Sequence, residues 1–293
     1  MNNQQKAFLC AAGVVLCWST VATAFKIALA EMSYAKLLLL ASFTALIIFL
    51  IDVIRKNSFR QITRKNAGKF AALGLLNPFL YYLVLFKAYS LLPAQVAQPL
   101  NYLWQIVLLL LSIPLLGTKV SKKQIVWFVV CFVGIVFISL QGSLTGFAES
   151  SIFGIILALS SAFIWALYWI FNNKTEPQTD SSLKLFVAFA FGFLFLLAYC
   201  ALFDDLQLPS IKGVTSAVYV GVFEMGITFI LWARALALST NRAAVISLTY
   251  LSPVLSLVLI FFVLGEILYW TTLVGFGLII LGTIKVNKNG TNN

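Results

Sequence analysis

Apolar residues run through almost the whole chain in segments of about 20, separated by short polar turns. A helix needs about 20 apolar residues to cross the hydrocarbon core of a bilayer, and the sequence holds ten such segments. They cover residues 7–29, 34–54, 67–90, 94–116, 124–142, 152–172, 182–203, 213–236, 243–264 and 268–286. These segments leave no room for a soluble domain. The pattern predicts an all-α polytopic membrane protein with ten transmembrane helices.

Composition agrees with the pattern, because 61% of the 293 residues are hydrophobic and only 10% are charged. The net charge of +11 would suit a nucleic-acid partner, but its distribution argues for topology instead. With the N-terminus inside, 16 of the 20 basic residues fall in inner loops, and only Lys26, Lys36, Lys87 and Lys212 fall outside. The positive-inside rule then places both termini in the cytoplasm. We expect an integral protein of a bacterial inner membrane that contacts lipid and no nucleic acid.

The residue types that most enzymes need are scarce in this chain. It has no histidine, which removes Ser-His-Asp catalysis and histidine-ligated metals. Cys10, Cys17, Cys131 and Cys200 lie in apolar segments without CxxC spacing, so neither a disulfide framework nor a metal site is expected. We expect no cofactor and no catalytic residue.

The second half of the sequence repeats the first. At a shift of 147 residues, Gly74 matches Gly221 and Asn77 meets Glu224; at a shift of 148, Tyr102 recurs as Tyr250. Each half, 1–146 and 147–293, holds five segments. Because five is odd, the second half enters the membrane from the opposite side, as an inverted repeat. Such repeats place a substrate site at the membrane midplane between two similar bundles, although an old duplication without mechanistic symmetry stays open.

Polar residues interrupt the fourth segment in "AQPLNYLWQIV" (97–107). Gln98, Asn101, Tyr102 and Gln105 stand at i, i+3, i+4 and i+7, on one stripe of a helix, with Trp104 at its edge. Polar groups facing lipid are costly, so the stripe faces a water-filled cavity or hydrogen-bonds to neighbouring helices. Pro99 frees the carbonyl of Gln95 and is expected to bend the helix near its outer end.

Two repeat-related stripes carry the next candidates. The third segment has Gly74, Asn77 and Tyr81 at i, i+3 and i+7, and the eighth has Gly221, Glu224 and Thr228 at the same spacing. Glu224 is the only acid near the middle of any segment. Burial penalises the charged form of a carboxylate, so Glu224 either carries a coupling proton, pairs with a substrate ammonium, or bonds structurally to Asn77 or a lysine.

Aromatic and hydroxyl residues complete the predicted site. Trp18 and Trp165 lie nearer mid-segment than membrane-interface tryptophans do, and the ninth segment contributes Tyr250 and Ser252. Lys26, Lys87 and Arg234 lie near segment ends, where they either snorkel to the interface or touch substrate. The predicted substrate-binding residues are Trp18, Asn77, Tyr81, Gln98, Asn101, Tyr102, Trp104, Gln105, Trp165, Glu224, Thr228, Tyr250 and Ser252.

These features resemble the ten-span drug/metabolite transporter superfamily, specifically its EamA-like members. "CWSTVATAFK" (17–26) is similar to the family's first-span pattern; "NYLW" (101–104), "FIWALY" (163–168) and "YLSPVLS" (250–256) resemble the aromatic amino acid exporters. Gln105 departs from that subgroup, which commonly continues with proline, so the substrate range is in doubt. The resemblance implies export of amino acids or related metabolites, without ATP, through a central cavity.

A transporter explains the repeat, the polar stripe and the absence of a soluble domain together. We therefore expect a uniporter or proton-coupled transporter, working as a monomer by alternating access on a small-molecule substrate. The alternatives are a permease for another metabolite or drug-like compound and, with weaker support, a membrane-embedded enzyme. A pump is disfavoured because the sequence has no G-x-x-x-x-G-K-[ST] phosphate-binding loop.

Overall fold

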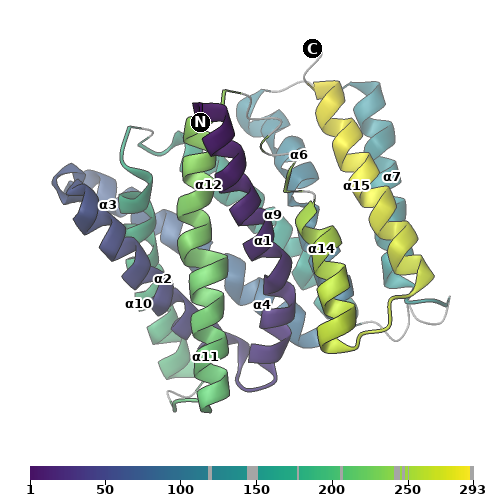
Figure 1. Cartoon of the computed structure of the whole chain (residues 1–293), viewed down its shortest axis with the longest axis horizontal. Coiled ribbons are helices and arrows are strands. Elements are labelled where there is room, and N and C mark those ends of the chain that lie inside the picture. The colour runs from purple at the N-terminus through teal and green to yellow at the C-terminus, as the bar shows by residue number, and fades with distance from the viewer. Residues whose placement is uncertain are drawn as a thin grey trace.

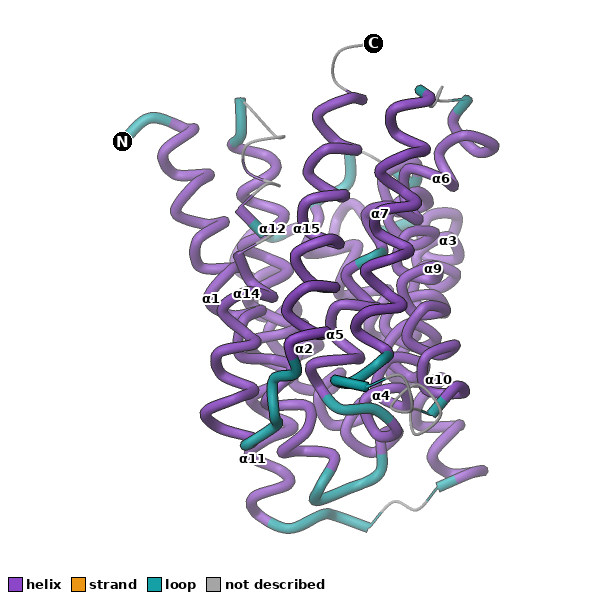
Figure 2. The backbone as a smooth tube through the Cα atoms, turned by 90° about the vertical axis from the view of Figure 1, so that its right-hand side faces the viewer, coloured by secondary structure: helices purple, strands orange, loops and turns teal. Residues whose placement is uncertain are grey.

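The computed structural model of the chain is a bundle of helices (Figure 1). It describes residues 1–117, 121–143, 151–176, 178–204, 207–240, 245, 248–249 and 251–290, and these residues form no strand. Helices α1 and α15 begin and end, respectively, at the same end of the bundle (Figures 1 and 2). The predicted all-helical architecture is confirmed.

The described residues of the first half form seven α-helices, one short 3₁₀ turn and one π-helix. In chain order they are α1 (Asn3–Leu29), α2 (Tyr34–Lys56), η1 (Ser58–Gln61), α3 (Arg64–Gly74), η2 (Leu75–Leu80), α4 (Tyr81–Leu91), α5 (Ala94–Tyr102), α6 (Trp104–Leu116) and α7 (Lys122–Ser139). The second half contains α9 (Ile152–Lys174), α10 (Ser181–Phe203), α11 (Ile211–Val220), η3 (Gly221–Gly226), α12 (Ile227–Leu238), α14 (Leu251–Leu259), η4 (Ile260–Leu264) and α15 (Trp270–Gly290).

Seven helical stretches of the described chain are long and apolar enough to cross a membrane. They are Asn3–Leu29, Tyr34–Lys56, Arg64–Leu91, Ala94–Leu115, Ile152–Asn172, Ser181–Phe203 and Ile211–Leu238. Three shorter apolar helices, Ile125–Ile138, Leu251–Leu264 and Trp270–Lys285, lie where the sequence predicts the fifth, ninth and tenth spans. The chain is therefore a polytopic helical membrane protein.

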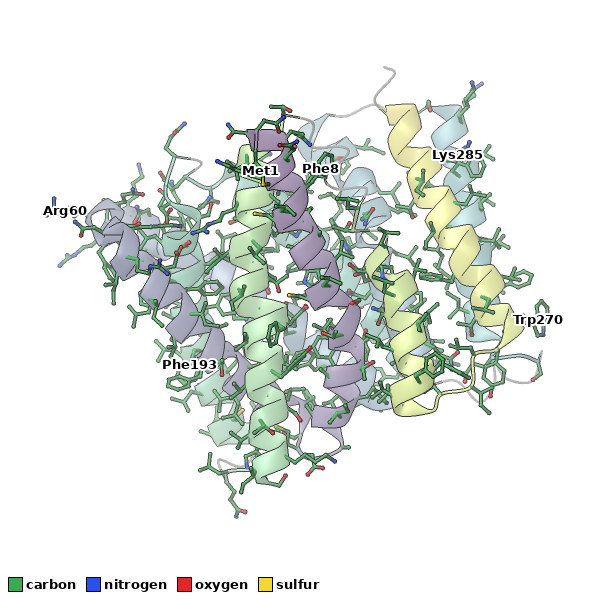
Figure 3. All side chains as sticks on the ribbon, in the orientation of Figure 1. Met1, Phe8, Arg60, Phe193, Trp270 and Lys285 are labelled. Atoms are coloured by element: carbon green, nitrogen blue, oxygen red, sulfur yellow. The ribbon has the colours of Figure 1, made fainter. Side chains whose placement is uncertain are left out.

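The outer surface of the bundle is apolar, as contact with lipid requires. On α7, Ile125, Val129 and Phe132 are each more than half exposed, and Trp270 projects from the margin of the bundle (Figure 3). Charged Arg60 and Lys285 project at the end where Met1 lies (Figure 3). A protein with such a surface would aggregate in water, whereas in a bilayer the apolar side chains contact lipid chains.

The third and eighth spans have matching local structure. Each consists of two α-helices joined by a π-helix, η2 in α3–η2–α4 and η3 in α11–η3–α12. The two spans run in opposite directions, because α3 lies at the end where α12 lies and α4 lies nearer the end of α11 (Figure 1). In the third span, the sequence explains why the helix is interrupted. Asn77 has φ −146° and ψ 120°, the extended geometry favoured immediately before a proline, here Pro78.

Equivalent glycines pack these two spans against equivalent helices of the other half. A Cβ on Gly74 would lie 2.2 Å from the carbonyl oxygen of Ala188 on α10, and one on Gly221 would lie 2.5 Å from that of Ala41 on α2. The two contacts are related by the shift of 147 residues found in the sequence: Gly74 corresponds to Gly221, and Ala41 corresponds to Ala188. Glycine is needed at both positions because the backbones approach too closely for any side chain.

Helices of the two halves also pack side by side elsewhere. The pair α7 and α15 lies along one side of the bundle (Figure 1), where Gly134 and Gly275 let the two backbones touch. At the end where the chain begins, Asp52 of α2 pairs with Lys56 at 2.6 Å and with Arg234 of α12 at 3.7 Å. Arg234, expected either to snorkel or to touch substrate, is thus held in an ion pair between helices of the two halves.

Candidate functional site

A cavity of about 50 Å³ lies inside the bundle, between helices from both halves of the chain. Its wall combines one acid, two amides, one threonine hydroxyl, seven aromatic side chains and two aliphatic side chains. The lining residues are Trp18, Val21, Phe25, Tyr81, Leu85, Tyr89, Gln98, Asn101, Tyr102, Trp104, Trp165, Glu224 and Thr249. Eight of the thirteen predicted site residues are among them.

Helical spacing explains how α1 and α4 form opposite parts of this wall. Trp18, Val21 and Phe25 follow one another at i, i+3 and i+7 on α1, and α4 presents Tyr81 and Tyr89 two turns apart. The ring of Phe25 packs edge-on against Tyr89, with centroids 5.1 Å apart. The two helices therefore enclose one end of the cavity with aromatic side chains.

Among the residues that the structure describes, Glu224 is the only acid that lines the cavity. It lies in the π-helix η3, and 7% of it is exposed. The hydroxyl of Tyr82 donates a hydrogen bond of 2.9 Å to Oε1, while Oε2 has no partner among the residues that the structure describes. A buried oxygen without a donor is costly, so this atom is suited to accept a hydrogen bond from a ligand.

A chain of hydrogen bonds fixes the amide side of the wall. Tyr81 donates through its hydroxyl to Oδ1 of Asn101 at 3.3 Å, and Nδ2 of Asn101 donates to Oγ of Ser161 on α9 at 2.9 Å. One turn before Asn101, Gln98 has a buried Oε1 for which the described chain offers no donor. The orientation of Asn101 is thus set by the protein, whereas Gln98 keeps an acceptor for a ligand.

Trp165 and Tyr81, which line the cavity together with the acid and the amides, belong to a cluster of aromatic rings. Trp165 lies against Tyr81 with ring centroids 4.4 Å apart and planes 27° apart, and against Tyr168 at 5.4 Å and 26°. Trp169 meets the edge of Trp165 at 5.7 Å. Such a wall offers π-faces to a flat ring and to an ammonium group.

The size of the cavity limits what it holds in this conformation. A volume of 50 Å³ holds a few water molecules, because one water needs about 10–15 Å³ of such volume. An amino acid therefore fits only after the surrounding helices separate. Within the described residues, no three acidic, cysteine or histidine side chains gather to hold a metal ion.

Four predicted site residues are buried outside the lining. The hydroxyl of Thr228 donates to the carbonyl of Phe223 across η3 at 2.5 Å, and Ser252 donates to the carbonyl of Val15 at 3.3 Å. Both hydroxyls therefore satisfy backbone groups. Tyr250 lies outside the residues that the structure describes.

The other two residues, Asn77 and Gln105, lie outside the lining because the helices that carry them are interrupted. Asn77 is fully buried, but its extended backbone takes it off the stripe that Gly74 and Tyr81 would share on a regular helix. Gln105 follows the break at Leu103, where the amide of Ile106 bonds back only three residues. Pro99 was expected to bend this span near its outer end, yet α5 and α6 separate at Leu103.

Sequence patterns missed several residues of the site. Tyr82, which bonds Glu224, and Ser161, which bonds Asn101, have no periodic relation to their partners. Val21, Phe25, Leu85 and Tyr89 resemble ordinary core residues, although the i, i+3, i+7 spacing from Trp18 could have identified the first two. Thr249 had a detectable signal, because it precedes Ser252 on the polar stripe of the ninth span.

Lys26 lies at the end of the cavity farther from the chain's N-terminus. Its Nζ donates to the last carbonyls of α4, those of Tyr89 at 3.0 Å and Leu92 at 3.1 Å. Glu266 accepts from the first amides of α5, those of Ala94 at 2.8 Å and Gln95 at 3.1 Å. Each charge has the sign that the helix dipole favours, so the turn between α4 and α5 is held by both halves of the chain.

A sequence profile described as the EamA-like transporter family matches the chain twice, over residues 5–140 and again over residues 152–288. The two matches together take in nearly all of the chain. The boundary between the two matches lies between residues 140 and 152, and the boundary between the halves 1–146 and 147–293 falls in the same interval.

Relatives in the curated proteins are distant. An uncharacterized transporter of Archaeoglobus fulgidus is 25% identical over half of this chain and 52% of its own length. The uncharacterized transporter YvbV of Bacillus subtilis is 26% identical over 88% of this chain and 85% of its own. The aromatic amino acid exporter YddG of Ancylobacter novellus is 25% identical over 64% of each.

A crystal structure matches the fold over 98% of both chains, with a TM-score of 0.69 and 18% sequence identity. At that identity the match concerns the arrangement of helices alone. The fold is thus one that an experimentally determined protein also adopts.

Proposed function

The chain belongs to the EamA-like transporter family, and from that premise we propose that it is a secondary-type transporter that exports amino acids or related small metabolites by alternating access. Its substrate passes through the cavity between the two halves. The runner-up is a permease for another small metabolite or drug-like compound.

One observation carries the choice of an amino acid. The free Oε2 of Glu224 lies in the same small cavity as the stacked rings of Trp165 and Tyr81. A carboxylate beside π-faces suits an ammonium group attached to an apolar or aromatic side chain. The name of the exporter from Ancylobacter novellus adds support for an aromatic amino acid.

The proposed architecture is a pair of inverted repeats, residues 1–146 and 147–293, that cross the membrane ten times with both termini in the cytoplasm. Three observations support it: the two profile matches, the opposite directions of α3–η2–α4 and α11–η3–α12 (Figure 1), and the equivalent contacts of Gly74 and Gly221. The concentration of basic residues in the predicted inner loops supports the cytoplasmic position of both termini, and we propose a bacterial inner membrane as the location.

Counterflow in proteoliposomes tests the substrate class. Vesicles loaded with unlabelled phenylalanine, tryptophan or leucine receive the labelled amino acid outside, and unlabelled analogues compete. We expect labelled amino acid to accumulate, 2-phenylethylamine to compete, and 3-phenylpropionate, which lacks the ammonium, to fail. Competition by 3-phenylpropionate but not by 2-phenylethylamine would reject Glu224 as the recognition group, and no counterflow for any amino acid would favour the other permease.

A further inference from the structure

A second hollow, a groove of about 450 Å³, opens between α1, α11 and the end of the ninth span. Its volume falls in the range of ligand pockets, about 300–1,000 Å³. Nine uncharged residues line it: Thr20, Thr23, Ala24, Ile27, Thr215, Ser216, Tyr219, Leu259 and Val263. We refer to this set as the α1–α11 groove.

Helix α1 separates this groove from the central cavity. Trp18, Val21 and Phe25 face the cavity, whereas Thr20, Thr23 and Ile27, which are spaced at i, i+3 and i+7, face the groove. The groove shares no lining residue with the cavity. It is therefore a distinct site, and a molecule bound in it would contact α1 on the face opposite the cavity and could shift that helix.

Side-chain interactions join the two walls of the groove at two places. At its inner end, the hydroxyl of Tyr219 donates to Oγ1 of Thr20 at 2.8 Å. At its outer end, Nζ of Lys212 pairs with Oε1 of Glu31 at 2.8 Å, and Ser210 donates to the same carboxylate at 2.7 Å. These hydrogen bonds hold the pKa of the Glu31 carboxyl below its usual value, so an ion pair stands at the mouth.

Polarity changes in steps along the groove. Lys212 lies one turn before Thr215 and Ser216 on the same face of α11, and Glu31 follows Ile27 by four residues in the turn after α1. Next to the ion pair the wall of the groove consists of hydroxyl side chains, and deeper in the groove it includes the apolar side chains of Ala24, Leu259 and Val263. The hydroxyl of Thr23, a residue only 6% exposed, is buried there without a partner in the described chain.

We propose that the α1–α11 groove binds one zwitterionic phospholipid, with a primary ammonium and a phosphate in its headgroup, from the leaflet at which α1 ends. The acyl chain fills the apolar wall, and the hydroxyl of Thr23 donates to an ester carbonyl. The phosphate meets the ammonium of Lys212, and the lipid ammonium meets the carboxylate of Glu31.

The ion pair at the mouth decides the headgroup class. The carboxylate of Glu31, paired with Lys212, repels a headgroup of net negative charge. A headgroup that carries both signs meets both partners at once. A soluble anion lacks the apolar chain for which the groove has room, so the lipid rather than a free phosphate is the occupant.

Native mass spectrometry of the full chain, released from detergent containing equal amounts of phosphatidylethanolamine and phosphatidylglycerol, tests the proposal. We expect the wild type to retain one phosphatidylethanolamine at least tenfold more often than phosphatidylglycerol. Glu31→Gln should abolish this preference, Lys212→Gln should lower the retention of both lipids because both carry the phosphate, and Ala24→Phe, which fills the groove, should abolish retention. Glycerophosphoethanolamine, which has the headgroup without acyl chains, should not displace the lipid at equal concentration.

Matched variants separate binding from misfolding. Val218→Phe adds the same ring to an exposed face of α11, and Lys87→Gln removes a basic residue of another helix; both should retain the lipid as the wild type does. Thr23→Val keeps the shape of the side chain and removes only the hydroxyl, so it should lower retention with unchanged thermal unfolding. Equal retention of the two lipids by the wild type, displacement by the soluble headgroup, or full retention by a folded Ala24→Phe variant would overturn the proposal.

Discussion

At the scale of single residues, we propose that Glu224 determines what the cavity binds. The Tyr82 hydroxyl satisfies Oε1, and the other oxygen is left for a ligand. Its repeat equivalent, Asn77, lies in the matching π-helix but outside the cavity. The two halves therefore contribute different chemistry to one site: the amides and six of the aromatic side chains come from the first half, and the carboxylate, Trp165 and Thr249 from the second.

Glu224→Gln should reduce counterflow at least tenfold, which corresponds to roughly 1.4 kcal/mol in binding or coupling. The amide preserves the size of the side chain and can still accept from Tyr82, so folding should be retained. Protonation removes the negative charge that attracts an ammonium, so wild-type transport should fall as the pH is lowered from 8.5 to 5.5. The variant should lose this dependence.

The control for that measurement is Glu176→Gln, which makes the same change at an exposed ion pair with Lys69. It should transport like the wild type at every pH. Near-normal transport by Glu224→Gln, with an unchanged pH profile, would make Glu224 a packing residue. Lost transport with retained substrate binding would instead assign it to proton coupling.

At the scale of elements, the broken helices position the site. The π-helices η2 and η3 interrupt the third and eighth spans at equivalent places, and such interruptions are frequent at functional sites because they re-aim side chains. In each half of the chain, a glycine lets the broken span pack closely against a neighbouring helix: Gly74 against α10 and Gly221 against α2. The position of Glu224 thus depends on the contact between Gly221 and α2.

Gly74→Ala and Gly221→Ala should each destabilise the protein by about 1–3 kcal/mol, because a Cβ at either position meets a backbone carbonyl that cannot move aside. Gly68→Ala is the matched control, since nothing lies within 4 Å of a Cβ there. It should be neutral or stabilising, as alanine favours a helix over glycine. Thermal unfolding in detergent measures all three, and a Gly74→Ala variant as stable as Gly68→Ala would contradict the close packing.

The sequence predicts the spans well and the breaks poorly. Apolar length locates each helix because the bilayer sets it, and the stripe of Gln98, Asn101 and Tyr102 was identified because those residues precede the break at Leu103. Gln105 and Asn77 were misplaced because the prediction assumed uninterrupted helices. Pro78 carried the missing signal, since a residue before proline avoids helical geometry. Contacts between spans, such as Tyr82 with Glu224, have no periodicity to find.

At the scale of the whole molecule, the structure has one conformation with a cavity too small for an amino acid. Lys26 and Glu266 bind the turn between α4 and α5 at one end, and Asp52 and Arg234 pair at the other. In the proposed transport cycle, passage of a substrate requires the two halves to move against each other. Inverted repeats make such a movement similar in both directions.

Side-specific cysteine labelling tests whether the cavity is reached alternately from both faces of the membrane. Single cysteines replace Gln98 and Trp104 in a cysteine-free background, with Leu110, which is exposed on the lipid side of α6, as the matched control. A membrane-impermeant thiol reagent is applied either to the outside of cells or to inverted vesicles. We predict that both cavity positions react from either side, that the amino acid identified by counterflow protects them from both, and that position 110 reacts poorly throughout. Labelling from one side alone, or labelling that substrate never reduces, would contradict transport through this cavity.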